Sequence, residues 1–309
     1  MPGMFAAAAT TPPVPITSGL MTTWGNPGDA PDRASGAKSA ELVLLGGKIR
    51  TPAHPSGFVQ AAAIGGGVVL ALGRDDEIRD FVGPFTRVVN LRGRLALPAF
   101  GDAHVHPVQG GLESLRCNLA GLRTRPDYLA KIAAYGRTLP RDAWVLGGGW
   151  SMPAFPGGTP NAADLDAVTD GRPAFLPNRD HHTAWVNTAA LDIAGLTALT
   201  PDPLDGRIER DHDGAPAGAL HDGAMRLVGD YVPPPTEAEL TAALLVGQAH
   251  LHSLGITSIQ DACVGEAGQL GMPDAFGTYR RAAADRLLTC RAARNRPASR
   301  RPPAVRQPA

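Results

Sequence analysis

Short apolar runs separated by glycine characterise the chain from about residue 40 to residue 97. The runs lie at 41–50, 60–65, 67–72 and 86–90, and Gly65-Gly66 stands between two of them. Runs of this length, bounded by glycine, are typical of β-strands joined by tight turns. The pattern predicts a small antiparallel β-unit over residues 40–97.

From Leu97 onward, strand-like apolar runs alternate with longer helical segments. The strand-like runs lie at 99–106, 143–147, 173–177 and 256–262, with the start of a fifth at 286–290. Helices are predicted at about 126–138, 161–169, 236–254 and 273–285. The third helix opens with Thr236 and Glu239, the spacing of a capping box, and residues 206–214 have the pattern of a hairpin. Such alternation favours βαβ units and a parallel sheet, and therefore an α/β fold.

The two ends of the chain differ from this pattern. Residues 1–39 are rich in Pro, Gly, Ala, Ser and Thr without a period, which predicts a flexible leader. The leader lacks a positively charged start, so we do not expect a secretory signal. Residues 291–309 hold six arginines, four prolines and one β-branched residue. They predict a disordered tail that forms neither strand nor packed helix; a nucleic-acid arm and out-of-frame sequence are the alternatives.

Charge and cysteine content exclude several classes of protein. Lys+Arg and Asp+Glu both total 29, so the chain lacks the basic surplus of a nucleic-acid binder. No apolar run approaches the roughly 20 residues of a membrane span. The three cysteines, Cys117, Cys263 and Cys290, form no CxxC pair, so a disulfide framework is not expected. A reducing compartment, the cytoplasm, is the location that this cysteine usage favours.

The strongest candidate for chemistry is the pair His104 and His106. On a strand, residues i and i+2 point to the same face, so the two imidazoles can converge on one ion. Neutral imidazoles are zinc ligands, and the pair ends an apolar run, at the strand end where parallel βα barrels place their chemistry. The sequence predicts a divalent metal, zinc, at these residues; the alternative is a pair of core or surface histidines. His250 and His252 share the spacing, but on a helix they do not face each other, which predicts solvent-facing side chains.

A polar segment, Asn178–Asn187, follows the run at 173–177. Arginine and histidine there can hold a carbonyl or carboxylate, and Trp185 can stack on a substrate, which favours a substrate pocket. The alternative is a polar loop that solvates a strand end. Asp222 and Asp261 could reach the same mouth, although an isolated acid is more often a capping or surface residue.

Four segments carry a resemblance to a known family: LPAFGDAHVHP, NRDHHTAWVNTAAL, DGRIERDHDGAPAGAL and LGITSIQDA. Over about residues 41–290 the chain resembles the amidohydrolase superfamily, in particular amidohydrolase family 3 with its formamide-deformylase-like (YtcJ-like) members. The resemblance implies a metal-dependent (β/α)₈ barrel beside a small β-sandwich, acting on C–N bonds that are often amides. It implies that His104 and His106 are metal ligands and that Asp180 and His182 lie at the substrate mouth.

The chain also departs from the pattern of the superfamily. Members generally add metal-binding histidines after the fifth and sixth strands and a catalytic aspartate after the eighth, whereas only about half of these strands can be counted here. No lysine follows Lys131, so the carboxylated lysine of many relatives has no counterpart, and a bridge between two metals would need another ligand such as Asp261. We therefore expect a C-terminally truncated, partial TIM-like barrel over residues 98–290, beside the β-sandwich portion at 40–97.

Two functional hypotheses follow. In the first, the chain is a metal-dependent amidohydrolase whose metal-activated water hydrolyses a non-peptide amide of a small molecule. In the second, it is a catalytically inactive fragment without the later ligands and catalytic aspartate. An incomplete barrel leaves a sheet edge and apolar surface uncovered, which predicts homo-oligomers or aggregation. Formamides, N-acyl amino acids and cyclic amides stay open as substrates, as does deamination of a ring amidine.

Overall fold

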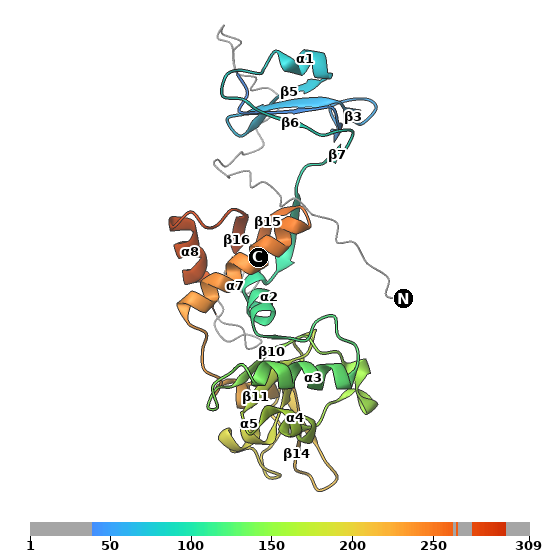
Figure 1. Ribbon diagram of the computed structural model, residues 1–309. Coiled ribbons are helices and arrows are strands. Elements are labelled where there is room, and N and C mark those ends of the chain that lie inside the picture. The colour runs from blue at the N-terminus through green and yellow to red at the C-terminus, as the bar shows by residue number, and fades with distance from the viewer. Residues whose placement is uncertain (1–38, 262–263, 265–273, 295–309) are drawn as a thin grey trace, which may run out of the picture. The chain divides into compact units, whose positions relative to one another are not determined.

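The computed structural model describes residues 39–261, 264 and 274–294, and the chain divides into two compact units at Phe100/Gly101 (Figure 1). Nearly all of the predicted leader and residues 295–309 of the predicted tail lie outside the described residues. Among the described residues, no helix combines the length and apolar character that a membrane span requires.

The first unit consists of two small sheets and one short helix. Strands β5 (Val68–Gly73), β4 (Ala61–Gly65), β1 (Leu42–Leu45) and β6 (Arg87–Asn90) form one sheet in that order, and β3 (Phe58–Val59), β2 (Lys48–Arg50) and β7 (Leu95–Ala96) form the other. Helix α1 (Asp75–Arg79) contributes Ile78 to a core with Val43, Leu45, Ala61 and Ala63.

The prediction of an antiparallel unit is wrong in part. β4 pairs with β1 and β5 in antiparallel fashion, but β1–β6 and β2–β7 are parallel. The chain between β1 and β6 passes through five further elements, which is long enough for a crossover that returns it in the same direction. The two-residue turn at Gly66-Gly67 enforces the antiparallel pairing of β4 with β5.

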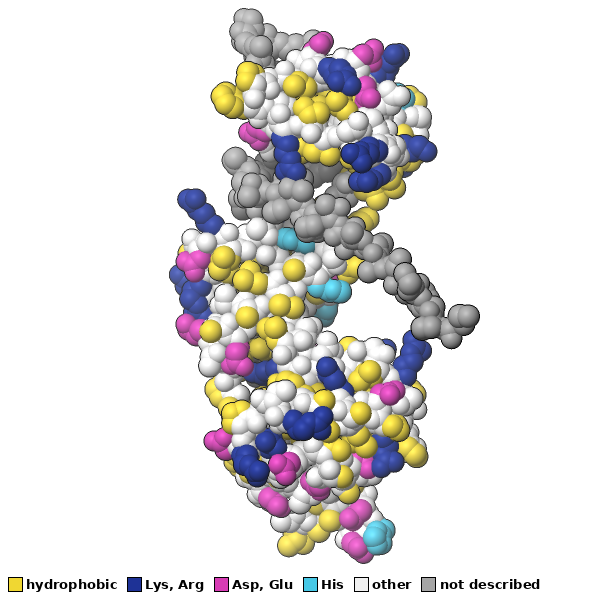
Figure 2. All heavy atoms as spheres, in the orientation of Figure 1, with side chains coloured by type: hydrophobic (Ala, Val, Ile, Leu, Met, Phe, Trp, Pro, Cys, Tyr) yellow, Lys and Arg dark blue, Asp and Glu magenta, His cyan; other side chains and the backbone are white. Residues whose placement is uncertain are grey.

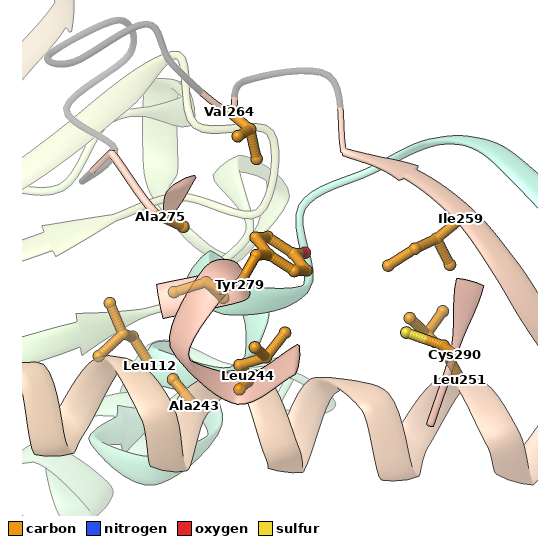
Figure 3. Close-up of a cluster of buried hydrophobic side chains, with 11 residues drawn as sticks. Leu112, Ala243, Leu244, Leu251, Ile259, Val264, Ala275, Tyr279 and Cys290 are labelled. Atoms are coloured by element: carbon orange, nitrogen blue, oxygen red, sulfur yellow. The ribbon is translucent and has the colours of Figure 1, made fainter. Parts of the chain in front are cut away.

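In the second unit, a three-stranded sheet is covered by helices. β8 (Phe100–Val105), β15 (Ile256–Asp261) and β16 (Arg291–Arg294) lie in the order β16-β15-β8. Helices α2 (Pro107–Leu115), α7 (Glu237–Ser253) and α8 (Phe276–Ala284) supply most of a buried cluster that includes Leu112, Ala243, Leu244, Leu251, Ile259 and Tyr279 (Figure 3). Helix α7 begins with the capping box that was predicted from Thr236 and Glu239.

Helices α2 and α7 approach each other through two glycines. A Cβ atom at Gly111 would lie 2.0 Å from the carbonyl oxygen of Ala243, and one at Gly247 would lie 2.3 Å from that of Pro107. Real Cβ atoms essentially never come this close to backbone. The first turns of α2, directly after His106, are therefore packed against the backbone of α7.

The second unit also contains a six-stranded sheet in the order β13-β14-β12-β11-β10-β9. Its strands are β9 (Cys117–Asn118), β10 (Val145–Gly148), β11 (Ala174–Pro177), β12 (Thr183–Val186), β13 (Gly206–Arg210) and β14 (Pro216–Asp222). Its helices are α3 (Arg125–Gly136), α4 (Ala162–Thr169), α5 (Thr188–Ile193) and α6 (Arg226–Gly229), with 3₁₀ turns η1 (Met152–Ala154), η2 (Pro156–Gly158) and η3 (Gly223–Met225). β9, β10 and β11 are parallel, whereas β11 to β13 pair antiparallel.

The expectation of a parallel sheet is therefore met only in part. Residues 183–186 were treated as part of a polar segment, but they form β12, in which every residue is buried. The turn before them reverses the chain because the Asn178 side-chain oxygen accepts hydrogen bonds from the backbone N–H groups of His182 (3.1 Å) and Thr183 (3.2 Å). β8 and β15 lie in a different sheet from β9–β11, and the described strands do not close into a barrel.

The prediction that no strand forms after residue 290 is wrong for its first four residues. Arg291–Arg294 form β16, parallel to β15, with Ser258 opposite Arg291 and Asp261 opposite Arg294. A strand at the sheet edge is held by backbone hydrogen bonds to its neighbour, which do not depend on a β-branched side chain. The predicted fifth strand at 286–290 thus lies a few residues later in the chain.

Two cysteines fall in the described part of the chain. Cys117 and Cys290 are both free and buried, and burial raises the pKa of the Cys117 thiol to about 12. At neutral pH this thiol is protonated and behaves as a small apolar side chain.

Candidate functional site

The two histidines of the HxH motif lie at the junction of β8 and α2. His104 is an exposed residue of β8, and His106 is the N-cap of α2. Pro107 fixes this boundary, because its ring fits the first turn of a helix and has no N–H to continue the strand. The ring centroids of His104 and His106 are 5.1 Å apart and the rings are nearly perpendicular, at 80°. The structure therefore brings together the two residues that the motif singled out.

Asp261, at the end of β15, joins this pair. Its Oδ1 lies 3.4 Å from His106 Nδ1, although 155 residues separate the two in sequence. Only 6% of the Asp261 side chain is exposed, against 28% for His106. The carboxylate thus contacts the imidazole from the buried side of the site.

Tyr279 of α8 contacts the other oxygen of the same carboxylate. Its hydroxyl donates a hydrogen bond of 3.0 Å to Asp261 Oδ2. Burial, together with the negative charge of Asp261, raises the pKa of Tyr279 far above its usual range, so the hydroxyl stays protonated. No sequence pattern indicates this contact, because one tyrosine in an amphipathic helix resembles any other core residue.

Two imidazoles and a carboxylate are the donor types that zinc takes in proteins. In the described part of the chain, their ligand atoms do not form a compact group of three. The only such group among these residues is Asp211, His212 and Asp213, exposed between β13 and β14. Asp211 there accepts hydrogen bonds from the backbone N–H groups of Asp213 and Ala215, which accounts for an acidic residue in this turn. The donor types near His104 and His106 are compatible with a metal ion.

The polar segment after β11 contains a second histidine–aspartate pair. His182 Nδ1 lies 2.7 Å from Asp222 Oδ1, and the two side chains are 65% and 56% exposed. Asp180 is exposed in the same turn. The structure therefore joins Asp222 to His182, and Asp261 to His106.

Trp185 has a different environment from its polar neighbours. Its indole is fully buried, and its Nε1–H donates to the carbonyl oxygen of Asn161 at 2.8 Å. Its ring packs edge-on against Phe155 and Trp150, at centroid distances of 5.1 and 6.2 Å. Because the whole of β12 is buried, this side chain is placed in the core and not beside the exposed Asp180 and His182.

A partly buried acid, Glu113, which was not singled out from the sequence, links α2 to the β11–β12 turn. Glu113 Oε1 lies 3.3 Å from His181 Nε2 and accepts a hydrogen bond of 2.8 Å from Gln109. Burial raises the pKa of Glu113, against the opposing effects of His181 and Gln109. His181 has φ of 60°, in the left-handed region that is uncommon for residues other than glycine.

Histidine side chains reach the surface over the part of the second unit that contains β8, α7 and β15 (Figure 2). His104 is among the exposed residues, as is His250 of α7, whereas His252 is half-buried. His250 is exposed to solvent, as predicted, and His252 is partly exposed.

A match to a protein-family model shows which family the chain belongs to. The model of the amidohydrolase family matches residues 87–307. The chain belongs to the amidohydrolase family. This confirms the resemblance that the four motifs carried.

Relatives of this amidohydrolase include proteins of different names. The chain is 32% identical to Protein LONG AFTER FAR-RED 3 of Arabidopsis thaliana, over 72% of the chain and 38% of that protein. It is 29% identical to N-substituted formamide deformylase of Arthrobacter pascens, over 72% of the chain and 43% of that protein. The chain thus spans less than half the length of these relatives.

A solved structure supports the fold of this amidohydrolase. An uncharacterized metal-dependent hydrolase from Pyrococcus furiosus matches 82% of the chain and 49% of its own length, with a TM-score of 0.57 and 23% identity. At this identity the match concerns the fold. The α/β architecture of the chain is therefore that of part of a known hydrolase structure.

Proposed function

We propose that this amidohydrolase hydrolyses a carbon–nitrogen bond of a small-molecule amide, other than a peptide bond, with a divalent metal held by His104 and His106. The observation that carries the proposal is the junction of β8 and α2, where the two imidazoles lie 5.1 Å apart and Asp261 contacts one of them. Zinc is the metal we propose, because two histidines beside a carboxylate are typical of its sites.

The residues of the chain have separate tasks in this scheme. A bound zinc supplies Lewis-acid chemistry and lowers the pKa of water at its site. His104 and His106 bind it as neutral imidazoles. Asp261 accepts the proton on His106 Nδ1, which leaves Nε2 as the ligand atom.

The exposed residues after β11 and β14 are proposed to meet the substrate. His182, held by Asp222 at 2.7 Å, can donate a hydrogen bond to a carbonyl or carboxylate of the amide. Asp180 lies in the same exposed turn. The name of the formamide deformylase relative makes N-substituted formamides the first substrates to try. A cytoplasmic location and self-association through an incomplete barrel are further parts of the proposal.

One observation favours the second hypothesis, an inactive member of the family. Within the described residues, the donors near His104 and His106 do not form a compact group of three. A site with two imidazoles binds zinc more weakly than the three protein ligands that catalytic zinc sites use. Such a chain would bind metal without turnover.

The deciding experiment measures zinc per chain and mass in solution for the wild type and for His104→Ala/His106→Ala. We expect about one zinc per chain in the wild type and loss of that zinc in the double variant. His250→Ala/His252→Ala is the matched control, because it removes the same two residue types at the same spacing and should leave zinc unchanged. Zinc that is equal in all three proteins would contradict the metal site.

Activity separates the two functions. Formate release from N-substituted formamides by the zinc-loaded wild type, but not by the His104→Ala/His106→Ala variant, would support the hydrolase. Stoichiometric zinc without turnover of formamides, N-acyl amino acids or cyclic amides would favour the inactive family member.

A further inference from the structure

We propose that Tyr279 is a positioning residue for the metal site: through Asp261 it orients His106 so that Nε2 binds the metal. The inference rests on the proposed function, because it concerns the same metal. It assigns a task to α8, a helix more than 160 residues downstream of the HxH motif. It also makes Asp261 a partner of a ligand, in place of a ligand itself.

Tyr279, Asp261 and His106 form a continuous chain of contacts. Tyr279 donates to Asp261 Oδ2 at 3.0 Å, and Asp261 Oδ1 lies 3.4 Å from His106 Nδ1. The two oxygens of one carboxylate thus serve two different partners. If the carboxylate rotated to bind a metal directly, both contacts would have to change.

The two residues that make the inner contact of this chain, Asp261 and Tyr279, are buried. Asp261 is 4% exposed and Tyr279 is 8% exposed, so neither contact is exchanged freely for water. A buried carboxylate needs hydrogen-bond donors to offset its lost hydration. The Tyr279 hydroxyl is such a donor, and it defines the direction in which the carboxylate points.

The Tyr279 hydroxyl is carried by a side chain that is packed in the core. The Tyr279 ring belongs to the same buried cluster as Leu244 and Ala243 of α7 (Figure 3). The chain after α8 is fixed to α7 as well, because Gln248 accepts hydrogen bonds from the backbone N–H groups of Thr289 and Cys290, at 2.7 and 3.1 Å. A hydroxyl on a packed ring is placed more reproducibly than one on an exposed side chain.

The two ring nitrogens of His106 have different partners in this arrangement. A histidine that binds a metal through one nitrogen commonly donates its other N–H to a carboxylate, which fixes the tautomer and the ring orientation. His106 has its Nδ1 on Asp261, so Nε2 is the nitrogen left for the ion. Tyr279 completes this arrangement by holding the carboxylate.

The test compares Tyr279→Phe with Thr278→Val in the full chain. Tyr279→Phe removes the hydroxyl and keeps the packed ring. Thr278 is the neighbouring residue and is also buried, and its hydroxyl has no hydrogen-bond partner among the described residues, so Thr278→Val removes a hydroxyl that is not hydrogen-bonded to Asp261. The measurements are zinc affinity, by competition with a chromogenic chelator, and the visible absorption spectrum of the Co²⁺-loaded protein.

We expect Tyr279→Phe to bind zinc about 10- to 100-fold more weakly than the wild type, as is typical when an outer partner of a metal ligand is removed. The Co²⁺ spectrum should change with it, while Thr278→Val should match the wild type in both measurements. A purely structural role would lower the thermal midpoint without altering the spectrum.

The outcomes distinguish this inference from the proposed function. Zinc binding that is lost in His104→Ala/His106→Ala but unchanged in Tyr279→Phe would overturn the positioning role and leave the metal site intact. Equal losses in Tyr279→Phe and Thr278→Val would also overturn it, because they would reflect general packing. A wild type that binds no zinc would overturn both.

Discussion

The second unit contains two histidine–aspartate pairs that differ in length and burial. His182 and Asp222 are 2.7 Å apart with both side chains more than half exposed, whereas His106 and Asp261 are 3.4 Å apart with the aspartate almost fully buried. Exposed ion pairs contribute about 0–1 kcal/mol to stability, but each buried polar group left without its hydrogen-bond partner costs about 1–3 kcal/mol. Loss of the His106–Asp261 contact should therefore lower the stability of the fold more than loss of the His182–Asp222 contact, although the former is the longer of the two.

The difference also separates the tasks of the two pairs. An exposed pair keeps its polar atoms available to a molecule from solution, at the cost of rigidity. A buried pair is not available in this way, but it holds its members in one geometry. The pair at His182 is suited to meeting a substrate, and the pair at His106 is suited to fixing a ligand atom.

The largest expected effect comes from removing each aspartate in turn. Asp261→Ala should lower the free energy of unfolding by about 3 kcal/mol, because it leaves two polar groups, the Tyr279 hydroxyl and His106 Nδ1, without this partner. Asp222→Asn, with a side chain that tolerates the φ of 49° at this position, should lower it by less than about 1 kcal/mol. Urea denaturation of both variants checks this. Equal losses would show that burial does not set the difference.

A smaller effect tests whether the region around His182 depends on its aromatic core. Trp185→Phe should cost about 2 kcal/mol, because it removes the hydrogen bond to Asn161 and leaves a cavity beside Trp150 and Phe155. Urea denaturation gives the stability, and KM for an accepted amide gives substrate binding. Unchanged stability with a raised KM would restore the role at the substrate that the sequence predicted for Trp185.

The smallest effect concerns Glu113, which connects the two regions through His181. Its pKa is raised by burial, so its contribution to stability is fully present below the ordinary glutamate pKa and is lost as the pH rises through the raised value. Glu113→Gln cannot ionise and should not show this loss. The difference in free energy of unfolding, wild type minus variant, should therefore fall as the pH rises above the ordinary glutamate pKa. A difference that rises with pH would mean that the attraction to His181 outweighs burial.

Local sequence signals predicted most of the elements that depend on local chemistry. The capping box at Thr236 and Glu239 located the start of α7, and the apolar runs located β10, β11 and β15 within a residue or two. Among the elements that were missed, helix α2 and strand β16 are determined by other interactions. Helix α2 contains adjacent glycines and is held by its close packing on α7, and β16 is held by backbone pairing with β15.

The candidate site was predictable only where its residues are close in sequence. The spacing of His104 and His106 was sufficient to expect that they lie together, and they do. Asp261 was named as a residue that could reach the substrate mouth or supply a ligand, but its contact with His106 depends on how β15 and β8 are assembled. The contribution of Tyr279 depends on the packing of α8, which no local pattern encodes.

The glycine contacts between α2 and α7 have a consequence for the gene. Every missense change of a glycine codon adds a side chain, and at Gly111 or Gly247 even a single methyl group would overlap a backbone oxygen of the opposite helix. Ordinarily mild replacements such as alanine or serine are therefore as disfavoured there as large ones. At these two codons only silent nucleotide changes preserve the close approach of α2 and α7 directly after His106.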